Sequence, residues 1–115
     1  MRVVERVYKA LADWNRLRIL KILEVKPMCV CGVAHILEIA QSAVSRHLRV
    51  LSDAELITRE RDGGYVEYSL NYESDLNPVR IQLNFLKKLM NEDAQIIKDQ
   101  KMASQIYKCD FPKDY

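Results

Sequence analysis

The sequence contains few glycines and lacks a glycine-rich loop. Only three of the 115 residues are glycine, and none lies in a pattern that cradles phosphate. The sequence also lacks a pairing of nucleophile and base with the spacing of a known catalytic motif. We therefore expect that the protein is not an enzyme.

Long apolar runs and a strong net charge are also missing. No stretch approaches the roughly 20 apolar residues that a membrane-spanning helix needs, and the opening MRVVERVYK lacks the apolar core of a signal peptide. The expected location is therefore the cytoplasm, without membrane contact. The formal net charge is only +2, from 18 basic and 16 acidic residues. Any affinity for nucleic acid must therefore come from a few well-placed contacts and should depend on salt.

Cysteine is scarce and odd in number. The three residues Cys29, Cys31 and Cys109 do not suggest a disulfide framework, because a reducing compartment keeps thiols reduced. Reactive or metal-binding thiols are the alternative.

The apolar residues that are present predict one compact domain over residues 1–115. Helical spacing predicts an amphipathic helix from Val3 to Leu11. Asp13 is expected to cap a second helix, WNRLRILKILEV, whose apolar residues would form the centre of the core. Its basic residues are expected to face solvent; they are Arg16, Arg18 and Lys21.

Two short helices joined by a tight bend are predicted over residues 33–52, VAHILEIAQSAVSRHLRVLS. Apolar residues three and four apart place Val44, Leu48 and Leu51 on one face of the second helix. The opposite face carries Gln41, Ser42, Ser45, Arg46, His47 and Arg49. Such donor-rich side chains suit base edges and phosphates in a DNA major groove, although a solvated polar face would have a similar composition.

A β-hairpin is predicted over residues 57–70, directly after this helix. Asp62-Gly63-Gly64 lies between two runs of β-forming residues, and glycine accepts the positive φ of a tight turn. Arg59 and Arg61 lie near its tip, within reach of a phosphate or the minor groove. A helix-turn-helix followed by a hairpin is a winged helix, so we expect a mainly α fold with a small hairpin.

A long C-terminal helix is predicted over about residues 76–100. Its apolar stripe of Leu76, Val79, Leu83, Leu86 and Met90 should pack against another long helix. The remaining tail, to residue 115, shows no clear period.

Cys29 and Cys31 precede the helix-turn-helix in the run Met28-Cys29-Val30-Cys31-Gly32. In a regular helix, residues two apart point about 200° away from each other, so chelation would need an open first turn. A helix N-terminus should also lower the pKa of these thiols and favour the thiolates that bind soft metals. Spacing alone favours two small buried hydrophobic groups, which is how most free cysteines behave.

Four runs of the sequence carry a resemblance in combination: KALADWNRLRILKIL, CVC, QSAVSRHLRVL and RERDGGYVEYSL. Together they resemble the ArsR/SmtB family of winged-helix, metal-responsive repressors, over about residues 7–70. The resemblance implies a homodimer joined by its first and last helices, bound to double-stranded operator DNA and released by a thiophilic ion. The expected contact residues of this seam are Leu83, Leu86 and Met90 with Val4 and Leu11. This chain departs from the usual family pattern at three places. Trp14-Asn15 stands where Pro-Thr is usual, and Glu38 stands where Gly or Asp is usual. Ala40 stands where Ser or Thr would cap the second helix.

The resemblance also implies that Cys29 and Cys31 bind As(III), Sb(III), Cd(II) or Zn(II). In arsenic-type members a third cysteine follows three residues later, where this chain has Ala34. Cys109 is therefore the candidate third thiolate, and His35 a weaker candidate ligand. No organic cofactor is expected.

Two other functions remain open at this point. Cys29 or Cys31 could pair with Cys109, which would make the protein a thiol-based redox or sulfide sensor of the same fold. The near-neutral charge of residues 41–70 would also permit a winged helix that binds protein and not DNA.

Overall fold

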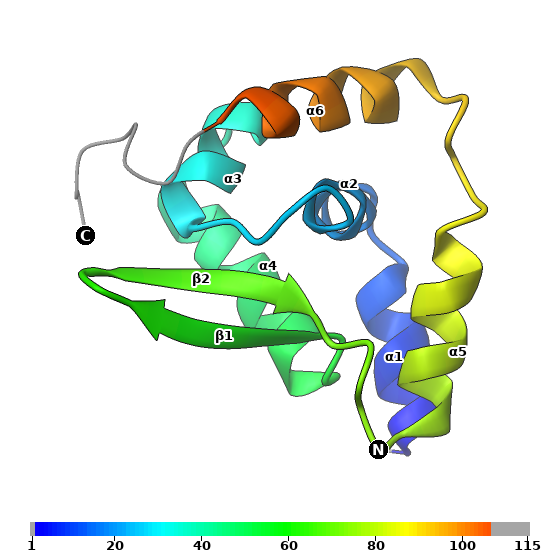
Figure 1. The fold of residues 1–115 in the computed structure, drawn as a ribbon. Coiled ribbons are helices and arrows are strands. Elements are labelled where there is room, and N and C mark those ends of the chain that lie inside the picture. The colour runs from blue at the N-terminus through cyan, green and yellow to red at the C-terminus, as the bar shows by residue number, and fades with distance from the viewer. Residues whose placement is uncertain (1, 107–115) are drawn as a thin grey trace.

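The computed structural model describes residues 2–106, which form six helices and a two-stranded antiparallel hairpin (Figure 1). The helices are α1 (Val3–Leu11), α2 (Trp14–Leu23), α3 (Val30–Leu37), α4 (Gln41–Asp53), α5 (Asn77–Leu86) and α6 (Ala94–Gln105). The strands are β1 (Ile57–Asp62) and β2 (Tyr65–Leu70). This is the predicted winged helix-turn-helix, with α3 and α4 as the two helices of the motif.

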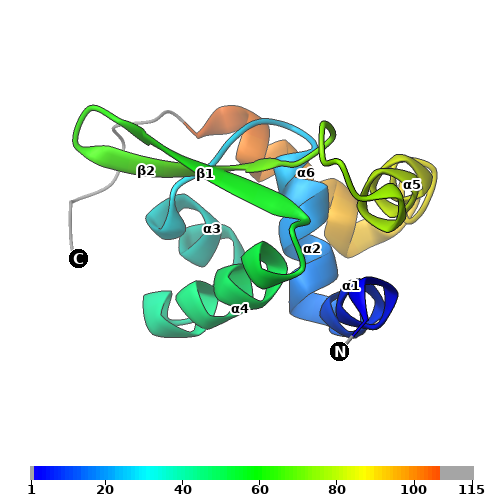
Figure 2. The same cartoon turned by 90° about the horizontal axis from the view of Figure 1, so that it is seen from below.

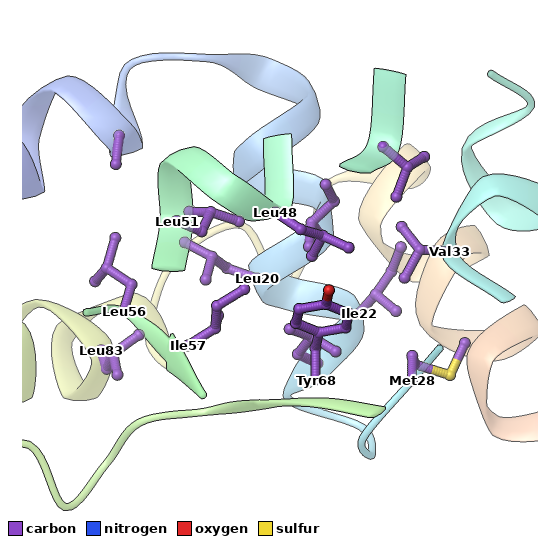
Figure 3. Packing of buried hydrophobic residues seen from close by; sticks show 14 of the residues in the cluster. Leu20, Ile22, Met28, Val33, Leu48, Leu51, Leu56, Ile57, Tyr68 and Leu83 are labelled. Carbon is purple, nitrogen blue, oxygen red and sulfur yellow. The ribbon is translucent and has the colours of Figure 1, made fainter. Parts of the chain in front are cut away.

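Helix α2 occupies the centre of the molecule, with the other elements around it (Figure 1). Its predicted N-cap is confirmed, because the Asp13 carboxylate accepts a hydrogen bond from the Arg16 amide at 3.1 Å. Leu20 and Ile22 of α2 pack against Leu48 and Leu51 of α4 (Figure 3). Each such fully buried aliphatic side chain contributes about 1.5–3 kcal/mol to folding.

The basic face of α2 is not the solvated surface that the sequence suggested. Lys21 is fully buried; its Nζ donates to the Leu86 carbonyl at 2.9 Å and forms a 2.8 Å ion pair with Glu24. Arg18 forms a bidentate pair with the buried Asp99 of α6, at 2.8 and 3.0 Å. Helix α6 covers this face, and a buried charge persists only when it is paired in this way.

The hairpin forms where the Asp62-Gly63-Gly64 turn predicted it. Ile57 pairs with Leu70 and Asp62 with Tyr65, which leaves Gly63 and Gly64 as a two-residue loop. Gly63 has φ +63°, which glycine adopts without strain. The register fixes which wing residues share a face.

The single helix predicted over about residues 76–100 is wrong. Helix α5 ends at Leu86, and α6 begins at Ala94. Between them Met90 adopts a left-handed backbone conformation with φ 62°, and the Asp93 carboxylate then caps α6 by accepting from the Gln95 and Ile96 amides. The predicted stripe therefore runs along α5 from its N-cap Leu76 and ends at the Met90 turn, and α6 packs on α2 as a separate helix.

Most of the contact residues expected for the seam are also wrong, although Val4 is 41% exposed. Leu83 and Leu86 are buried within the subunit, and Leu11 and Met90 are half-buried against the same core. The opposite face of α5 is exposed: 61% of Ile81 and 54% of Phe85 remain accessible. The stripe of Leu83 and Leu86 packs in its own core, because α1 and α2 already cover it.

No helix within residues 2–106 combines the length and the apolar character needed to cross a membrane.

Candidate nucleic-acid interface and thiol site

The apolar face of α4 determines how the helix is rotated about its own axis. Val44, Leu48 and Leu51 are at most 1% exposed, so the opposite strip faces solvent. Before α4, the chain turns at Glu38, which has φ 58° and ψ 42°, and its amide donates to the Ala34 carbonyl at 2.9 Å. Of the predicted strip, the structure leaves Ser42, Ser45, Arg46 and Arg49 exposed and Gln41 and His47 half-buried.

His47 is held by a neighbour that sequence reasoning did not identify. Its Nδ1 lies 3.3 Å from Nη1 of Arg16, whose Nε and Nη2 donate to the Ala10 and Lys9 carbonyls at 2.7 and 3.2 Å. A guanidinium has donors only, so Nδ1 must accept and the proton of a neutral ring lies on Nε2. His47 therefore presents an N–H donor, and Arg16 links the end of α1 to α4.

The wing arginines lie on one face of β1. Arg59 pairs with Tyr68 and Arg61 with Val66, and both arginines are exposed. A hollow of about 350 Å³ between α4 and the hairpin is lined by Val30, Ser45, Arg59, Arg61, Gly64, Val66 and Tyr68. The fold thus brings Ser45 of the strip and both wing arginines to one groove.

The two thiols of the CVC run already converge. Cys29 Sγ and Cys31 Sγ are 3.7 Å apart. Cys29 is the N-cap of α3, with φ −85° and ψ 167°, so it is extended and the helical argument against chelation does not apply to it. Two thiolates on one tetrahedral Zn(II), with Zn–S bonds of about 2.3 Å, would lie roughly 3.8 Å apart. The expectation that the first turn must open is therefore wrong.

The protonation of Cys29 also differs from the expectation. Burial raises the pKa of the Cys29 thiol, and the hydrogen bond that Sγ accepts from the Gly32 amide at 3.4 Å opposes this only in part. Desolvation of the thiolate outweighs the partial charge of the helix end. Ion binding by Cys29 would therefore displace a proton from its thiol.

The thiol segment is joined to the wing. Met28 and Tyr68 form an isolated antiparallel bridge, with N–H···O distances of 3.1 and 2.8 Å in the two directions. Figure 3 shows Met28 and Tyr68 side by side at the edge of the core. Cys29 therefore lies one residue away from a backbone link to β2.

The end of α6 lies over the same segment. A Cβ added to Gly32 would lie 3.9 Å from Ile106 Cγ2, and Lys26 donates to the Ile106 carbonyl. Cys109 lies outside the described residues. His35 is exposed on α3, and residues 2–106 contain no group of three or more His, Cys, Asp or Glu side chains placed to hold a metal ion.

Comparison with known proteins agrees with this geometry. The model of the bacterial regulatory protein arsR family matches residues 13–59. The arsenical resistance operon repressor of Bacillus subtilis is 43% identical over 74 residues, which cover 64% of this chain and 70% of that protein. The chain belongs to the ArsR family.

Two further matches extend this family assignment along the chain. The transcriptional repressor SdpR of B. subtilis is 33% identical over 89 residues, covering 77% of this chain and 99% of that repressor. The homodimeric winged helix-turn-helix domain of Mb0332 from Mycobacterium bovis matches with a TM-score of 0.65 and 27% identity, over 78% of this chain and 80% of that one. This ArsR-family chain is a DNA-binding transcriptional repressor and not an enzyme.

Proposed function

We propose that this ArsR-family repressor binds operator DNA as a homodimer and leaves it when Cys29 and Cys31 bind a thiophilic metal or metalloid. The observation that carries the proposal is the 3.7 Å separation of the two sulfurs at the start of α3, one residue from the bridge to the wing. The relative named as an arsenical resistance operon repressor supports As(III) or Sb(III) as the ion, and Cd(II) and Zn(II) fit the same thiolate chemistry.

DNA binding is assigned to α4 and the wing. Arg46, Arg49 and Ser42 occupy the outward face of α4 and can contact base edges, with Gln41, Ser45 and His47 on its flanks. Arg59 and Arg61 reach the phosphate backbone beside the helix. Family membership in a class of DNA-binding repressors removes the alternative of a winged helix that binds only protein.

Dimerisation is assigned to the exposed apolar faces of α1 and α5. Val4, Tyr8, Ile81 and Phe85 are each more than 40% exposed, and a hollow of about 220 Å³ lies between these two helices. A second copy would cover them, as expected of a two-fold interface that presents two α4 helices to a pseudo-palindromic site.

Cys109 is the proposed third thiolate. It follows Ile106 by three residues, and a chain of three residues spans at most about 11 Å. Ile106 lies against Gly32, the residue after Cys31, so a span of three residues is long enough for the thiol to reach the pair within one subunit. Trivalent arsenic would then have three sulfur ligands.

Coupling to DNA runs through the wing. Because the two sulfurs already lie close to the separation that a bound ion needs, the ion acts by fixing Cys29 relative to Cys31, and the two hydrogen bonds between Met28 and Tyr68 extend this restraint to β2. A tenfold to hundredfold loss of operator affinity requires only about 1.4–2.7 kcal/mol of coupling, and DNA must weaken ion binding by the same factor.

X-ray absorption of the arsenite- or cadmium-loaded protein tests the site itself. We expect three sulfurs around arsenic in the native protein and two in Cys109→Ser. An oxygen- or nitrogen-only shell would contradict the thiolate site, and three sulfurs in Cys109→Ser would exclude Cys109 as a ligand.

A thiol-based redox or sulfide switch is the second candidate, because thiols 3.7 Å apart can be joined as a disulfide when an oxidant removes two electrons, and either could pair with Cys109 instead. Metal titration under reducing conditions separates the two. A thiolate-to-metal absorption band with loss of DNA binding supports the metal switch, whereas loss of DNA binding only after oxidation supports the redox switch.

A further inference from the structure

The helix-turn-helix and wing do not carry an excess of positive charge. Residues 41–70 contain four arginines and five acidic residues. Residues 2–16 contain four basic residues, Arg2, Arg6, Lys9 and Arg16, against two acidic ones. Phosphate contacts dominate the affinity of proteins for DNA. The basic N-terminal segment is therefore the candidate for further contacts with DNA phosphates.

Helix α1 has three distinct faces. Val7 and Ala10 are buried in the core, and Val4 and Tyr8 lie on the exposed apolar flank beside α5. The third flank carries Arg2, Arg6 and Lys9, which recur at helical spacing and are all exposed, with the exposed Glu5 at its edge. Within residues 2–106, neither the Arg6 nor the Lys9 side chain forms an ion pair.

This basic flank faces the end of α4 across a hollow of about 410 Å³. Its lining residues are Arg6, Lys9, Ala10, Arg16, Val50, Asp53 and Ala54. Arg16 is held by the Lys9 and Ala10 carbonyls and by His47, so it forms the wall between α1 and α4. Asp53 contributes the only negative charge among these seven side chains.

The hollow lies on the opposite side of α4 from the wing. Ser45 lines the groove shared with Arg59 and Arg61, whereas Val50 and Asp53 line the hollow shared with α1. Figure 2 shows α4 and α1 along the same edge of the molecule, with α1 beyond the C-terminal end of α4. The exposed strip of α4 is therefore flanked by cations on both sides.

We infer that Arg6 and Lys9 form a second phosphate-contact site, which grips the DNA backbone on the side of α4 opposite the wing. The inference rests on the proposed mode of operator binding. In the proposed dimer, α1 lies at the seam, so the two copies of this site would face the backbone between the two half-sites. The contact is with phosphate and therefore carries no sequence preference.

The test is the salt dependence of binding to operator and scrambled duplexes. The double variant Arg6→Gln/Lys9→Gln should weaken both duplexes by a similar factor of about 10 to 100, and lower the slope of log affinity against log salt by about 2–4 per dimer, since each lost phosphate contact contributes about 0.9. Asp53→Asn should strengthen both duplexes a few-fold. The matched control is Lys98→Gln/Lys101→Gln, which removes two exposed cations from α6.

Equal slopes and affinities for the Arg6→Gln/Lys9→Gln and Lys98→Gln/Lys101→Gln proteins would overturn the inference. So would a loss confined to the operator duplex, because that result would indicate base contact. If the native protein binds neither duplex, the mode of operator binding fails as well. Sedimentation of each variant checks that dimer assembly is unchanged, and the single variants Arg6→Gln and Lys9→Gln replace the double variant if it is not.

Discussion

Individual side chains on α4 differ in what they offer to DNA. Arg46 is exposed with a full set of donors, whereas His47 is half-buried and its Nδ1 faces Arg16, which leaves Nε2–H as its donor. Arg61 on the wing is exposed and can contact the phosphate backbone, which is the same in every sequence. The donors of α4 should therefore contribute to sequence discrimination, and Arg61 to affinity alone.

Arg46→Ala and His47→Ala are each expected to weaken operator binding by about 1–3 kcal/mol while leaving scrambled DNA nearly unaffected. Arg61→Ala should weaken operator and scrambled duplexes alike. Fluorescence anisotropy with both duplexes measures the ratio. Unchanged discrimination in Arg46→Ala and His47→Ala would show that another face of α4 enters the groove.

At the scale of the elements, the turn between α3 and α4 contains a residue that is poorly suited to its backbone conformation. Glu38 adopts φ 58°, where the β-carbon of an L-residue crowds the following carbonyl. Ala40 is the N-cap of α4 and has no side chain that could accept a capping hydrogen bond. The Ser42 side chain does not provide this hydrogen bond either. Both departures from the family pattern lie in the same bend.

Glu38→Gly should raise the free energy of unfolding by roughly 0.5–1 kcal/mol, because relief of the left-handed strain exceeds the added entropy of the unfolded chain. Glu38→Ala removes the same charge but keeps the β-carbon, so it should give no such gain. Urea denaturation of the three proteins measures the difference. Equal gains in both variants would assign the effect to the carboxylate.

The winged helix-turn-helix could be predicted because its signals are local. Leu48 and Leu51 mark one face of α4, and Asp62-Gly63-Gly64 marks the turn of the wing. The break between α5 and α6 could not be predicted, since Met90 is not a residue that typically adopts positive φ and its spacing from Leu86 continues the apolar stripe. Spacing along the chain does not distinguish one long helix from two that meet the same core.

The thiol site, too, could be predicted from the sequence only in part. The identities of Cys29 and Cys31 indicated soft-metal chemistry, but their 3.7 Å separation depends on an extended N-cap that the sequence did not reveal. The burial of Lys21 was missed for a related reason: a lysine in an apolar helix is typical of a solvated edge, and only the packing of α6 closes that edge.

At the scale of the whole molecule, the exposed apolar surface of α1 and α5 is the feature left without a partner in a single subunit. Tyr8 and Phe85 are each 54% exposed, and the Tyr8 hydroxyl accepts from Gln82 at 3.1 Å, which ties the two helices into one surface. The wing projects away from these two helices (Figure 1), whereas the C-terminal end of α4 lies beside α1 (Figure 2). Pairing of two such surfaces would set the separation of the two recognition helices.

Ile81→Glu and Phe85→Glu should therefore give folded monomers with weakened operator binding, because a charge buried at the seam costs several kcal/mol. Val25→Glu, also at an exposed apolar position, should remain dimeric. Leu86→Glu should instead unfold the subunit, since Leu86 is only 5% exposed. Analytical ultracentrifugation with circular dichroism distinguishes these results, and dimeric Ile81→Glu and Phe85→Glu proteins would exclude this seam.

The central claim is that Cys29 and Cys31 together couple an ion to release of DNA, and operator affinity with and without arsenite, antimonite or cadmium under reducing conditions tests it most directly. The native protein should lose about tenfold to hundredfold in affinity on ion addition. Cys29→Ser and Cys31→Ser should bind the operator as tightly as the native protein without ion, and should keep that affinity when the ion is added. Normal release of DNA by both serine variants would contradict the account.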